Sequence, residues 1–522
     1  MRSGFLSFAL LPLILFGANG GLTAQMPYEQ KLDEVKQFQK FYKKYKDEAT
    51  RVESIMDLKV ADCPEAVQAL LPILKGKDPI LREAAKEVIS SYREPGTFSF
   101  MVEQLLEMKD RDMRAGFIDI LSKARQNKVK PVIRQLWTEE SKKLSILERY
   151  YIAKCLERLG SHEFEDILAA LAFDEAWEVQ VAALDAVKKN KIVSLGPKMV
   201  PLLDSKIPQV KTSAIQTLAV LRPMEAVWPL IEILKEQGRN QIDASEALYA
   251  ITMRDYGTDH DRWAKQWKKL TSLEGFRLPT EAEIAKSRET REKYNVIYGK
   301  LKGKKSTFAG IPTTSTRIVY IIDVSASMND VVVDKAKFKD GGYNSFQKLD
   351  IVKTELIRTI NGLDKTVHFN IIAFAAKTKS WKSWLTPCSI NQKASAISFV
   401  KRLQPLGLGG SGAFGGGGAD GSGKTNTYAA LTKAFEYDPN KGVVLTGKQS
   451  TRRVQLDTIY FLSDGVPTIG KYTDTDDILR EIRKINEVRK VVIHCISIGD
   501  FQAGFLKTLA QQSGGVFVDL GG

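Results

Sequence analysis

Between Tyr28 and Leu270 the apolar residues recur at the spacing of three and four positions that an amphipathic helix requires. Glycine, proline and Asp-Pro signals interrupt this pattern about every 30 residues. Each interruption predicts the end of one helix and the start of the next. The pattern therefore predicts an all-α region of short helices over residues 26–270.

The apolar positions of this region also repeat with a common period. One apolar anchor can be placed in each second helix, and successive anchors are separated by 32, 35, 31, 31 and 33 residues. A small or apolar residue stands four positions before each anchor, on the same helix face. Such units bury their apolar stripes only against their neighbours, so the repeat predicts a stacked solenoid with one long concave surface. The anchors are Ile89, Leu121, Leu156, Val187, Leu218 and Ile251, and the residues four positions earlier are Ala85, Phe117, Ile152, Ala183, Ala214 and Ala247.

Residues 78–85, which read Asp-Pro-Ile-Leu-Arg-Glu-Ala-Ala, resemble the HEAT family of helical repeats. The resemblance covers about 200 residues and implies a succession of helix pairs. The resemblance is weaker in the last unit. There Ala244 stands seven positions before the anchor, where most of the earlier units carry a basic residue. The aromatic stretch 256–263, followed by Trp267, is expected to cap the end of the stack, because the ends of solenoids need a cover.

After Gly310 the pattern changes to short β-branched runs that alternate with helical stretches. The runs at 318–322 and 491–496 are apolar without alternation, as in strands covered on both faces. This alternation predicts an α/β doubly wound (Rossmann-like) domain over residues 316–522. The expected strands are 317–323, 368–375, 458–462, 491–497 and 516–520, and the expected helices are 348–360, 391–403, 425–435, 476–488 and 501–510.

The two remaining segments are not expected to belong to either domain. Residues 271–315 are rich in Glu, Lys and Arg, which predicts a charged linker. Residues 1–25 combine an early arginine, about a dozen apolar residues and a small-residue exit, as in a signal peptide. The apolar stretch is too short to span a bilayer. We therefore expect a secreted or periplasmic protein with no transmembrane segment in the mature chain.

Length and charge refine this division. A chain of 522 residues is too long for one ordinary core, so several domains are expected. The net charge is +15, of which residues 301–522 carry 30 − 19 = +11. Such an excess permits weak attraction to nucleic acid or anionic lipid but indicates no specific chemistry. A nucleic-acid partner is therefore not expected.

The four cysteines and four histidines are scattered along the chain. No C-x-x-C pair is present, which argues against a zinc ribbon or a disulfide scaffold. No H-E-x-x-H motif or G-x-S-x-G elbow accompanies the histidines, so hydrolase chemistry is not supported and no catalytic residue is predicted.

Oxygen-bearing side chains gather instead at the predicted strand ends. Asp323 ends the first strand and is followed by Ser325 and Ser327, Thr425 opens a predicted helix, and Asp464 follows the strand 458–462. Ligands of such sheets bind beyond the carboxyl ends of the strands, where these residues should meet. Hydroxyl oxygens with only two carboxylates suit a small hard cation, Mg²⁺ before Ca²⁺.

With this order of motifs, residues 316–522 resemble the von Willebrand factor type A (VWA) family with its metal-ion-dependent adhesion site. The resemblance implies that Asp323, Ser325, Ser327, Thr425 and Asp464 are the five metal-site positions. It implies Mg²⁺ as the cofactor, with Mn²⁺ or Ca²⁺ as substitutes. It also implies a protein partner whose acidic side chain replaces a water on the cation.

The glycine-rich stretch 407–423 offers a rival interpretation. Residues 418–425 fit the phosphate-loop pattern G-x-x-x-x-G-K-[ST], with Lys424 as its lysine, and a P-loop nucleotide hydrolase is one alternative. The strand that should lead into such a loop is missing from the pattern. Residues 407–412 fit G-x-G-x-x-G but neither follow a strand nor open a helix.

These expectations combine into one functional hypothesis. The sequence predicts an exported, non-catalytic, adhesion-type protein in which the solenoid and the Mg²⁺ site are separate recognition surfaces for protein partners. The alternative from another class is an RNA-binding protein, because the Ro ribonucleoprotein autoantigen also joins helical repeats to this type of domain. Predicted export argues against that alternative.

Overall fold

The structure is a computed structural model in which the chain separates into two compact units, Met1–Met113 and Arg114–Gly522. The predicted signal peptide and the glycine-rich stretch 407–423 lie outside the described residues. The structure describes residues 26–123, 127–160, 162–287, 289, 307–312, 314–343, 345–405, 424–437, 456–499 and 503–520.

The first unit consists of short helices whose starts are encoded locally. Proline occupies the first turn of three of them, where its missing N–H costs no hydrogen bond. Asp78 caps α4 by accepting from the backbone N–H groups of Ile80 and Leu81. The repeat positions Ala85 and Ile89 are fully buried on α4. The helices are α1 (Tyr28–Phe41), α2 (Glu48–Asp57), α3 (Pro64–Leu74), α4 (Pro79–Ser91) and α5 (Pro95–Glu107), and α6 (Arg111–Lys123) spans the division between the units.

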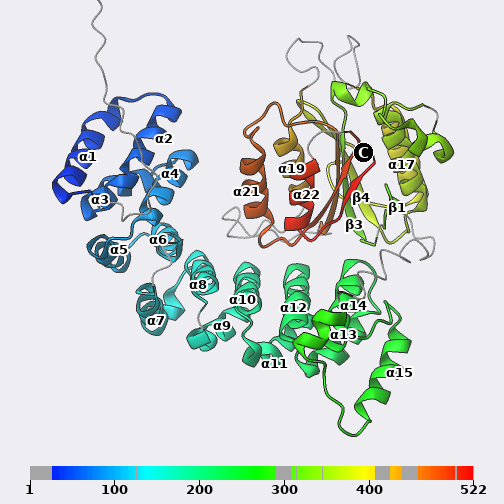
Figure 1. Cartoon of the computed structure of the whole chain (residues 1–522), viewed down its shortest axis with the longest axis horizontal. Helices are drawn as coiled ribbons and strands as arrows, with labels where there is room; N and C mark the ends of the chain where they lie inside the picture. The colour runs from blue at the N-terminus through cyan, green and yellow to red at the C-terminus, as the bar shows by residue number, and fades with distance from the viewer. Residues whose placement is uncertain are drawn as a thin grey trace, which may run out of the picture. The chain divides into compact units, whose positions relative to one another are not determined.

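The second unit begins with further helices (Figure 1). The five repeat anchors from Leu121 to Ile251 are all fully buried, and so are the small or apolar residues four positions before them. The prediction of an all-helical region is therefore confirmed, while the HEAT assignment stays a prediction. These helices are α7 (Val129–Glu140), α8 (Ile146–Leu159), α9 (Glu165–Ala172), α10 (Trp177–Lys189), α11 (Gly196–Met199), α12 (Pro208–Leu221), α13 (Val227–Ile233), α14 (Arg239–Thr252) and α15 (His260–Thr271).

The aromatic stretch that was expected to cap the stack lies on and before α15. Trp263 is buried, and its indole N–H donates to the carbonyl of Gly257 at 2.9 Å. Trp267 is also buried and packs edge to face on Phe276. Both indoles therefore serve packing in this part of the chain.

The C-terminal part of the second unit is a mixed sheet with strand order β5-β4-β3-β7-β8-β9. Strands β3, β4, β7, β8 and β9 are parallel, as predicted. Two short antiparallel strands, β5 and β6, pair with β4 and were not foreseen. The strands are β3 (Arg317–Asp323), β4 (His368–Phe374), β5 (Thr378–Ser380), β6 (Thr386–Pro387), β7 (Thr458–Ser463), β8 (Val492–Ser497) and β9 (Phe517–Asp519).

Helices cover both faces of this sheet, as Figure 1 shows. Ile318, Tyr320 and Ile322 of β3 pack in a core with α17 (Lys348–Gly362) and α18 (Ile390–Lys401). Val319 and Ile321 point to the opposite core, because successive side chains of a strand alternate. That second core contains α19 (Thr427–Phe435), α21 (Thr475–Asn486) and α22 (Ala503–Gln512). The predicted α/β doubly wound fold is confirmed.

A small hairpin lies in the segment that was predicted as a charged linker. Strands β1 (Thr307–Phe308) and β2 (Ile311–Pro312) are joined through Gly310, whose φ of 82° suits glycine. Phe308 is fully buried in the core beside α17. The end of the segment 271–315 therefore belongs physically to the α/β domain.

The amino ends of the strands contact the helices of the second unit. Lys490, just before β8, pairs with Asp185 of α10 at 2.5 Å. Glu487 pairs with Lys154 of α8 at 2.6 Å. Arg239 of α14 donates to the backbone carbonyl of Lys490. The helices of the second unit therefore contact the sheet at the amino ends of its strands, opposite to the carboxyl ends.

The four cysteines are buried free thiols in the structure. Burial raises the pKa of Cys495, which points to an inert core residue. No helix among the described residues combines the length and the hydropathy that crossing a membrane would require.

His494 on β8 predicts a pH dependence of stability. Its ring stacks on Tyr460, and its Nδ1 accepts from the N–H of Val516 at 3.0 Å. Burial, and then the charge of Arg239, lower the pKa of His494 to about 4. The unfolded chain then binds the proton first as the pH falls, so this group costs about 2 kcal/mol of stability at pH 5 relative to neutral pH.

His494→Asn should reduce that pH-dependent loss, because the amide oxygen can replace Nδ1 as the acceptor without binding a proton. Urea unfolding of both proteins at pH 7.5 and pH 5 measures it, since other titrating groups cancel in the comparison. An equal loss in the two proteins would show that His494 is not the group responsible.

Candidate functional site

Asp323 ends β3 and forms the floor of the candidate site. Its side chain is completely buried, and both of its oxygens are used. Oδ1 accepts from the N–H of Ser325 at 2.8 Å, and Oδ2 accepts from the hydroxyl of Ser463 at 2.6 Å. Burial, and then the nearby charge of Asp464, raise the pKa of Asp323 to about 6. The fold therefore keeps a carboxylate where water cannot stabilise its charge.

The two serines lie in the loop that follows. Their hydroxyl oxygens are 3.2 Å apart, and the hydroxyl of Ser327 donates to Oδ1 of Asp464 at 2.8 Å. The N–H of Asp330 donates to the carbonyl of Ser327 and closes a turn. One hydroxyl of this loop therefore bonds a carboxylate from another loop, and the second hydroxyl lies beside the first.

Asp464 stands directly after β7, beside β3 in the sheet. Its side chain has no exposed surface. While Oδ1 accepts from Ser327, Oδ2 accepts from the ammonium of Lys348 at 2.8 Å. The lysine comes from the first position of α17.

Thr425 approaches from a third loop, just before α19. It is buried, its N–H donates to the hydroxyl of Thr468, and its carbonyl accepts from the N–H of Thr468. A Cβ added to Gly465 would lie 3.3 Å from the hydroxyl of Thr425, 3.8 Å from that of Ser327 and 4.0 Å from Oδ2 of Asp323. Oxygens from three loops thus surround one point, which only a glycine leaves open.

The structure therefore brings together all five residues selected from the sequence. The donor set consists of three hydroxyls and two carboxylates, without nitrogen or sulfur. Such oxygen ligands fit a small hard cation such as Mg²⁺. No cluster of three or more His, Cys, Asp or Glu residues suited to a metal occurs in the described part of the chain, and the oxygen cluster itself contains only two such residues.

Sequence reasoning missed two residues that hold the site. Ser463 bonds Asp323, and its place beside Asp464 at a strand end was the available signal. Lys348 bonds Asp464 from a distance of 116 residues along the chain. Its signal was weaker: a lysine in the first turn of a predicted helix faces the positive end of the helix dipole and needs a compensating anion.

The rival phosphate-loop lysine, Lys424, is exposed. Helix α18 ends at Lys401, and the described residues 402–405 that follow contain no strand. A phosphate loop requires a strand directly before it. The pattern at 418–425 lies mostly outside the described residues and gains no support from those that flank it.

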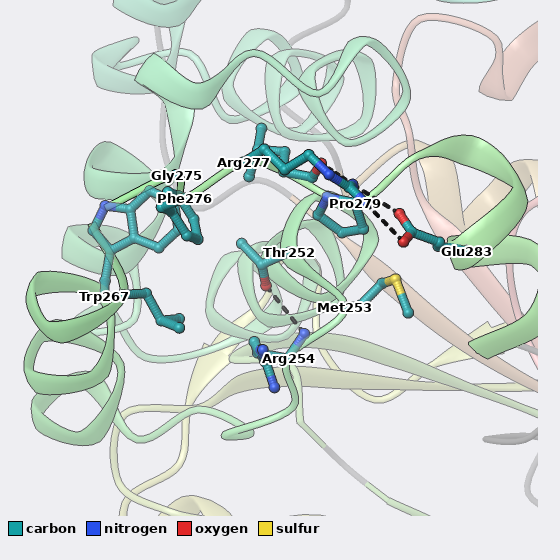
Figure 2. Close-up of a pocket in the computed structure, with 11 residues that line it drawn as sticks. Thr252, Met253, Arg254, Trp267, Gly275, Phe276, Arg277, Pro279 and Glu283 are labelled. Atoms are coloured by element: carbon teal, nitrogen blue, oxygen red, sulfur yellow. Dashed lines mark hydrogen bonds and ion pairs between the residues drawn. The ribbon is translucent and has the colours of Figure 1, made fainter. Parts of the chain in front are cut away.

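A cavity of about 470 Å³ lies beside α14 and α15 (Figure 2). Trp267 and Phe276 pack against each other on one side of it. Arg277 and Glu283 pair at 2.9 Å on the other side, so their charges already satisfy each other. Thr252 and Arg254 also line the cavity, and the N–H of Arg254 donates to the hydroxyl of Thr252.

The sequence of the α/β part matches the model of the von Willebrand factor type A domain over residues 316–416 and 418–519. The C-terminal part of this chain therefore matches a VWA domain in sequence, and the oxygen cluster lies at the carboxyl ends of its central strands.

Three curated relatives match about two fifths of this chain. Inter-alpha-trypsin inhibitor heavy chain H4 of Homo sapiens is 25% identical over 211 residues, which are 40% of this chain and 18% of the relative. The von Willebrand factor A domain-containing protein 3A of Homo sapiens is 26% identical over 220 residues, 41% of this chain and 14% of the relative. Inter-alpha-trypsin inhibitor heavy chain H1 of Mesocricetus auratus is 24% identical over 203 residues, 38% of this chain and 18% of the relative. The match spans less than a fifth of each of these relatives.

Proposed function

We propose that this protein is an exported, non-catalytic binding protein that holds Mg²⁺ at the carboxyl edge of its VWA domain and captures an acidic side chain of a partner protein. The observation that carries the proposal is the convergence of Asp323, Ser327 and Thr425 on one point above Gly465. Export is proposed from the signal-like residues 1–25.

Each residue has a definite task in this proposal. Ser325, Ser327 and Thr425 would supply neutral hydroxyl oxygens, and the two aspartates would supply the negative charge. Bound Mg²⁺ would contribute a Lewis-acidic centre with an exchangeable water. The hydrogen bonds from Ser463 and from the N–H of Ser325 orient Asp323 before any cation arrives.

The charge of the site favours an anionic ligand. The two aspartates alone balance the two charges of Mg²⁺, the hydroxyls add no charge, and the ammonium of Lys348 lies beside Asp464. A carboxylate from a partner can therefore replace a water without meeting an excess of negative groups. An adhesion-type role also fits the match to a VWA domain, which accounts for about two fifths of the chain.

Among the described residues of the second unit, the contacts of three helices lie away from the candidate site. The helices α8, α10 and α14 contact residues before β8, at the amino ends of the strands. The five candidate ligands lie at the carboxyl ends. A partner could therefore reach the cation without displacing those helices.

Capture of a protein partner should require the cation and the hydroxyl of Thr425. We expect a pull-down from the surrounding medium or envelope to recover a partner in Mg²⁺, and to lose it with a chelator or with Thr425→Val, which keeps the side-chain shape. Isothermal titration with Mg²⁺ on both proteins gives the matching affinities. Partner recovery that is unchanged by chelator would contradict the proposal.

Lys424→Ala separates this proposal from nucleotide hydrolysis. Mg²⁺ binding should be unchanged in this variant, because the exposed Lys424 is not among the residues of the oxygen cluster. A phosphate loop would instead need the lysine for binding of ATP with Mg²⁺. Titration with Mg²⁺ alone and with Mg²⁺–ATP, on wild type and variant, decides between the two functions.

A further inference from the structure

Lys348 is a charged residue in an unfavourable place. It occupies the first position of α17, where the helix dipole is positive, and its side chain is only 12% exposed. Its ammonium lies 2.8 Å from Oδ2 of Asp464. A Cβ on Gly499 would come within 3.2 Å of that nitrogen, so the glycine leaves the room that the lysine needs.

The backbone of Lys348 is also hydrogen-bonded to the loop that carries Ser325 and Ser327. Its N–H donates to the carbonyl of Asp330 at 2.9 Å, and the N–H of Asp330 donates to the carbonyl of Ser327. Gln347, the preceding residue, forms a β-bridge with Val331. The position of the ammonium is therefore fixed relative to both Ser327 and Asp464.

We propose that Lys348 sets the charge of the Mg²⁺ site and thereby its selectivity for a carboxylate ligand. This inference rests on the proposed function. The neighbouring groups Asp323, Asp464 and Lys348 carry a formal charge of −1 together. With Mg²⁺ the sum becomes +1, whereas without the lysine it would be zero. The lysine thus makes the loaded site cationic.

Removal of Lys348 should change the affinity for Mg²⁺ and the affinity for a carboxylate in opposite directions. The ammonium repels Mg²⁺, so its removal should tighten Mg²⁺ binding by roughly ten-fold. The same ammonium attracts a carboxylate, so its removal should weaken carboxylate binding to the loaded site by a similar factor, roughly ten-fold. A residue that merely supported the fold would, when removed, weaken both.

The test compares wild type with Lys348→Met. Calorimetric titration gives the affinity for Mg²⁺ alone. Water-proton relaxation of the Mn²⁺-loaded protein gives the affinity for acetate, with acetamide as its neutral counterpart. Lys353→Met is the matched control, because Lys353 lies on the same helix and pairs only distantly with Asp350, at 3.8 Å. We expect the control to behave as wild type.

The outcomes separate the two proposals. Tighter Mg²⁺ binding with a smaller preference for acetate over acetamide supports the role of Lys348. Weaker or unchanged Mg²⁺ binding in Lys348→Met overturns that role but leaves the metal site standing. Absence of Mg²⁺ binding in wild type overturns the proposed function itself. If Lys348→Met does not fold, Lys348→Gln is measured against Lys348→Arg, which should remain like wild type.

Discussion

Asp323→Asn is expected to raise the melting temperature of the protein in the presence of a chelator and to abolish the further increase caused by Mg²⁺. Burial, and then the charge of Asp464, raise the pKa of Asp323 to about 6 in the folded chain. The usual value for an unfolded aspartate is about 3.9. At neutral pH the metal-free folded protein therefore carries a buried negative charge on Asp323, and this charge destabilises it.

The sign of the effect follows from proton linkage. The folded state binds the proton more tightly than the unfolded state, so this group destabilises the metal-free protein as the pH rises through 4 to 6. Above pH 6 the cost is about 3 kcal/mol. Asparagine removes the charge, can still accept from the N–H of Ser325, and can donate to the hydroxyl of Ser463.

Thermal unfolding at pH 7.5 and at pH 4, each with Mg²⁺ and with chelator, measures the effect. The variant should gain stability over wild type at pH 7.5 and lose most of that gain at pH 4. Asp330→Asn is the control, because it removes an exposed carboxylate from the same loop. A variant that is less stable than wild type in chelator, or that still responds to Mg²⁺, would contradict the assignment of Asp323.

Asp185→Leu is expected to destabilise the second unit by about 3 kcal/mol, because it leaves the ammonium of Lys490 without its carboxylate in a desolvated contact. Nζ of Lys490 lies 2.5 Å from Oδ2 of Asp185. Burial opposes the ionisation of Asp185, but Lys490 and then Lys188 outweigh it and lower the pKa of Asp185. The carboxylate of Asp185 is therefore ionised in the folded protein, whereas burial lowers the pKa of Lys490 and the charges of Asp185 and Glu487 oppose that shift.

The double variant Asp185→Leu/Lys490→Met is the matched control. Replacement of both partners removes the unpaired charge, so the double variant should recover most of the lost stability. Urea unfolding at pH 7.5 of wild type, both single variants and the double variant gives the coupling energy. Additive effects of the two substitutions would show that the contact between α10 and Lys490 does not contribute.

The sequence predicted the elements of the α/β domain well because its central strands are buried on both faces. The continuous apolar run of β3 left few other interpretations, and its end at Asp323 matches the structure. Strands β5 and β6 were missed because three and two residues, such as Thr378–Ser380, are too few to show any periodicity. They are defined by pairing with β4.

The helical region was predictable for a related reason. Six anchors share one period, and a fully buried residue such as Leu156 or Leu218 stands at each. The hairpin around Gly310 was hidden because the average charge of residues 271–315 masked two apolar residues, Phe308 and Ile311. Local composition cannot show that a distant core has a place for them.

The residues of the candidate site could be selected from the sequence because Asp323, Ser325 and Ser327 are close neighbours at the end of a strand. Lys348 was not found because its role depends on Asp464, 116 residues away, and on the absence of a side chain at Gly499. Its only local signal, a lysine in the first turn of a predicted helix, does not name the anion that it meets. Long-range electrostatic pairs of this kind become visible only once the chain is folded.

The helices contact the sheet at the amino ends of its strands, and the oxygen cluster lies at the carboxyl ends. This arrangement has a mechanical consequence. A pull on a captured partner would run lengthwise along β3, β7 and β8 toward the contacts of Lys490 and Glu487. The backbone bonds between these parallel strands would then be strained together in shear, instead of opening one after another as in a zipper. Such an arrangement resists tension.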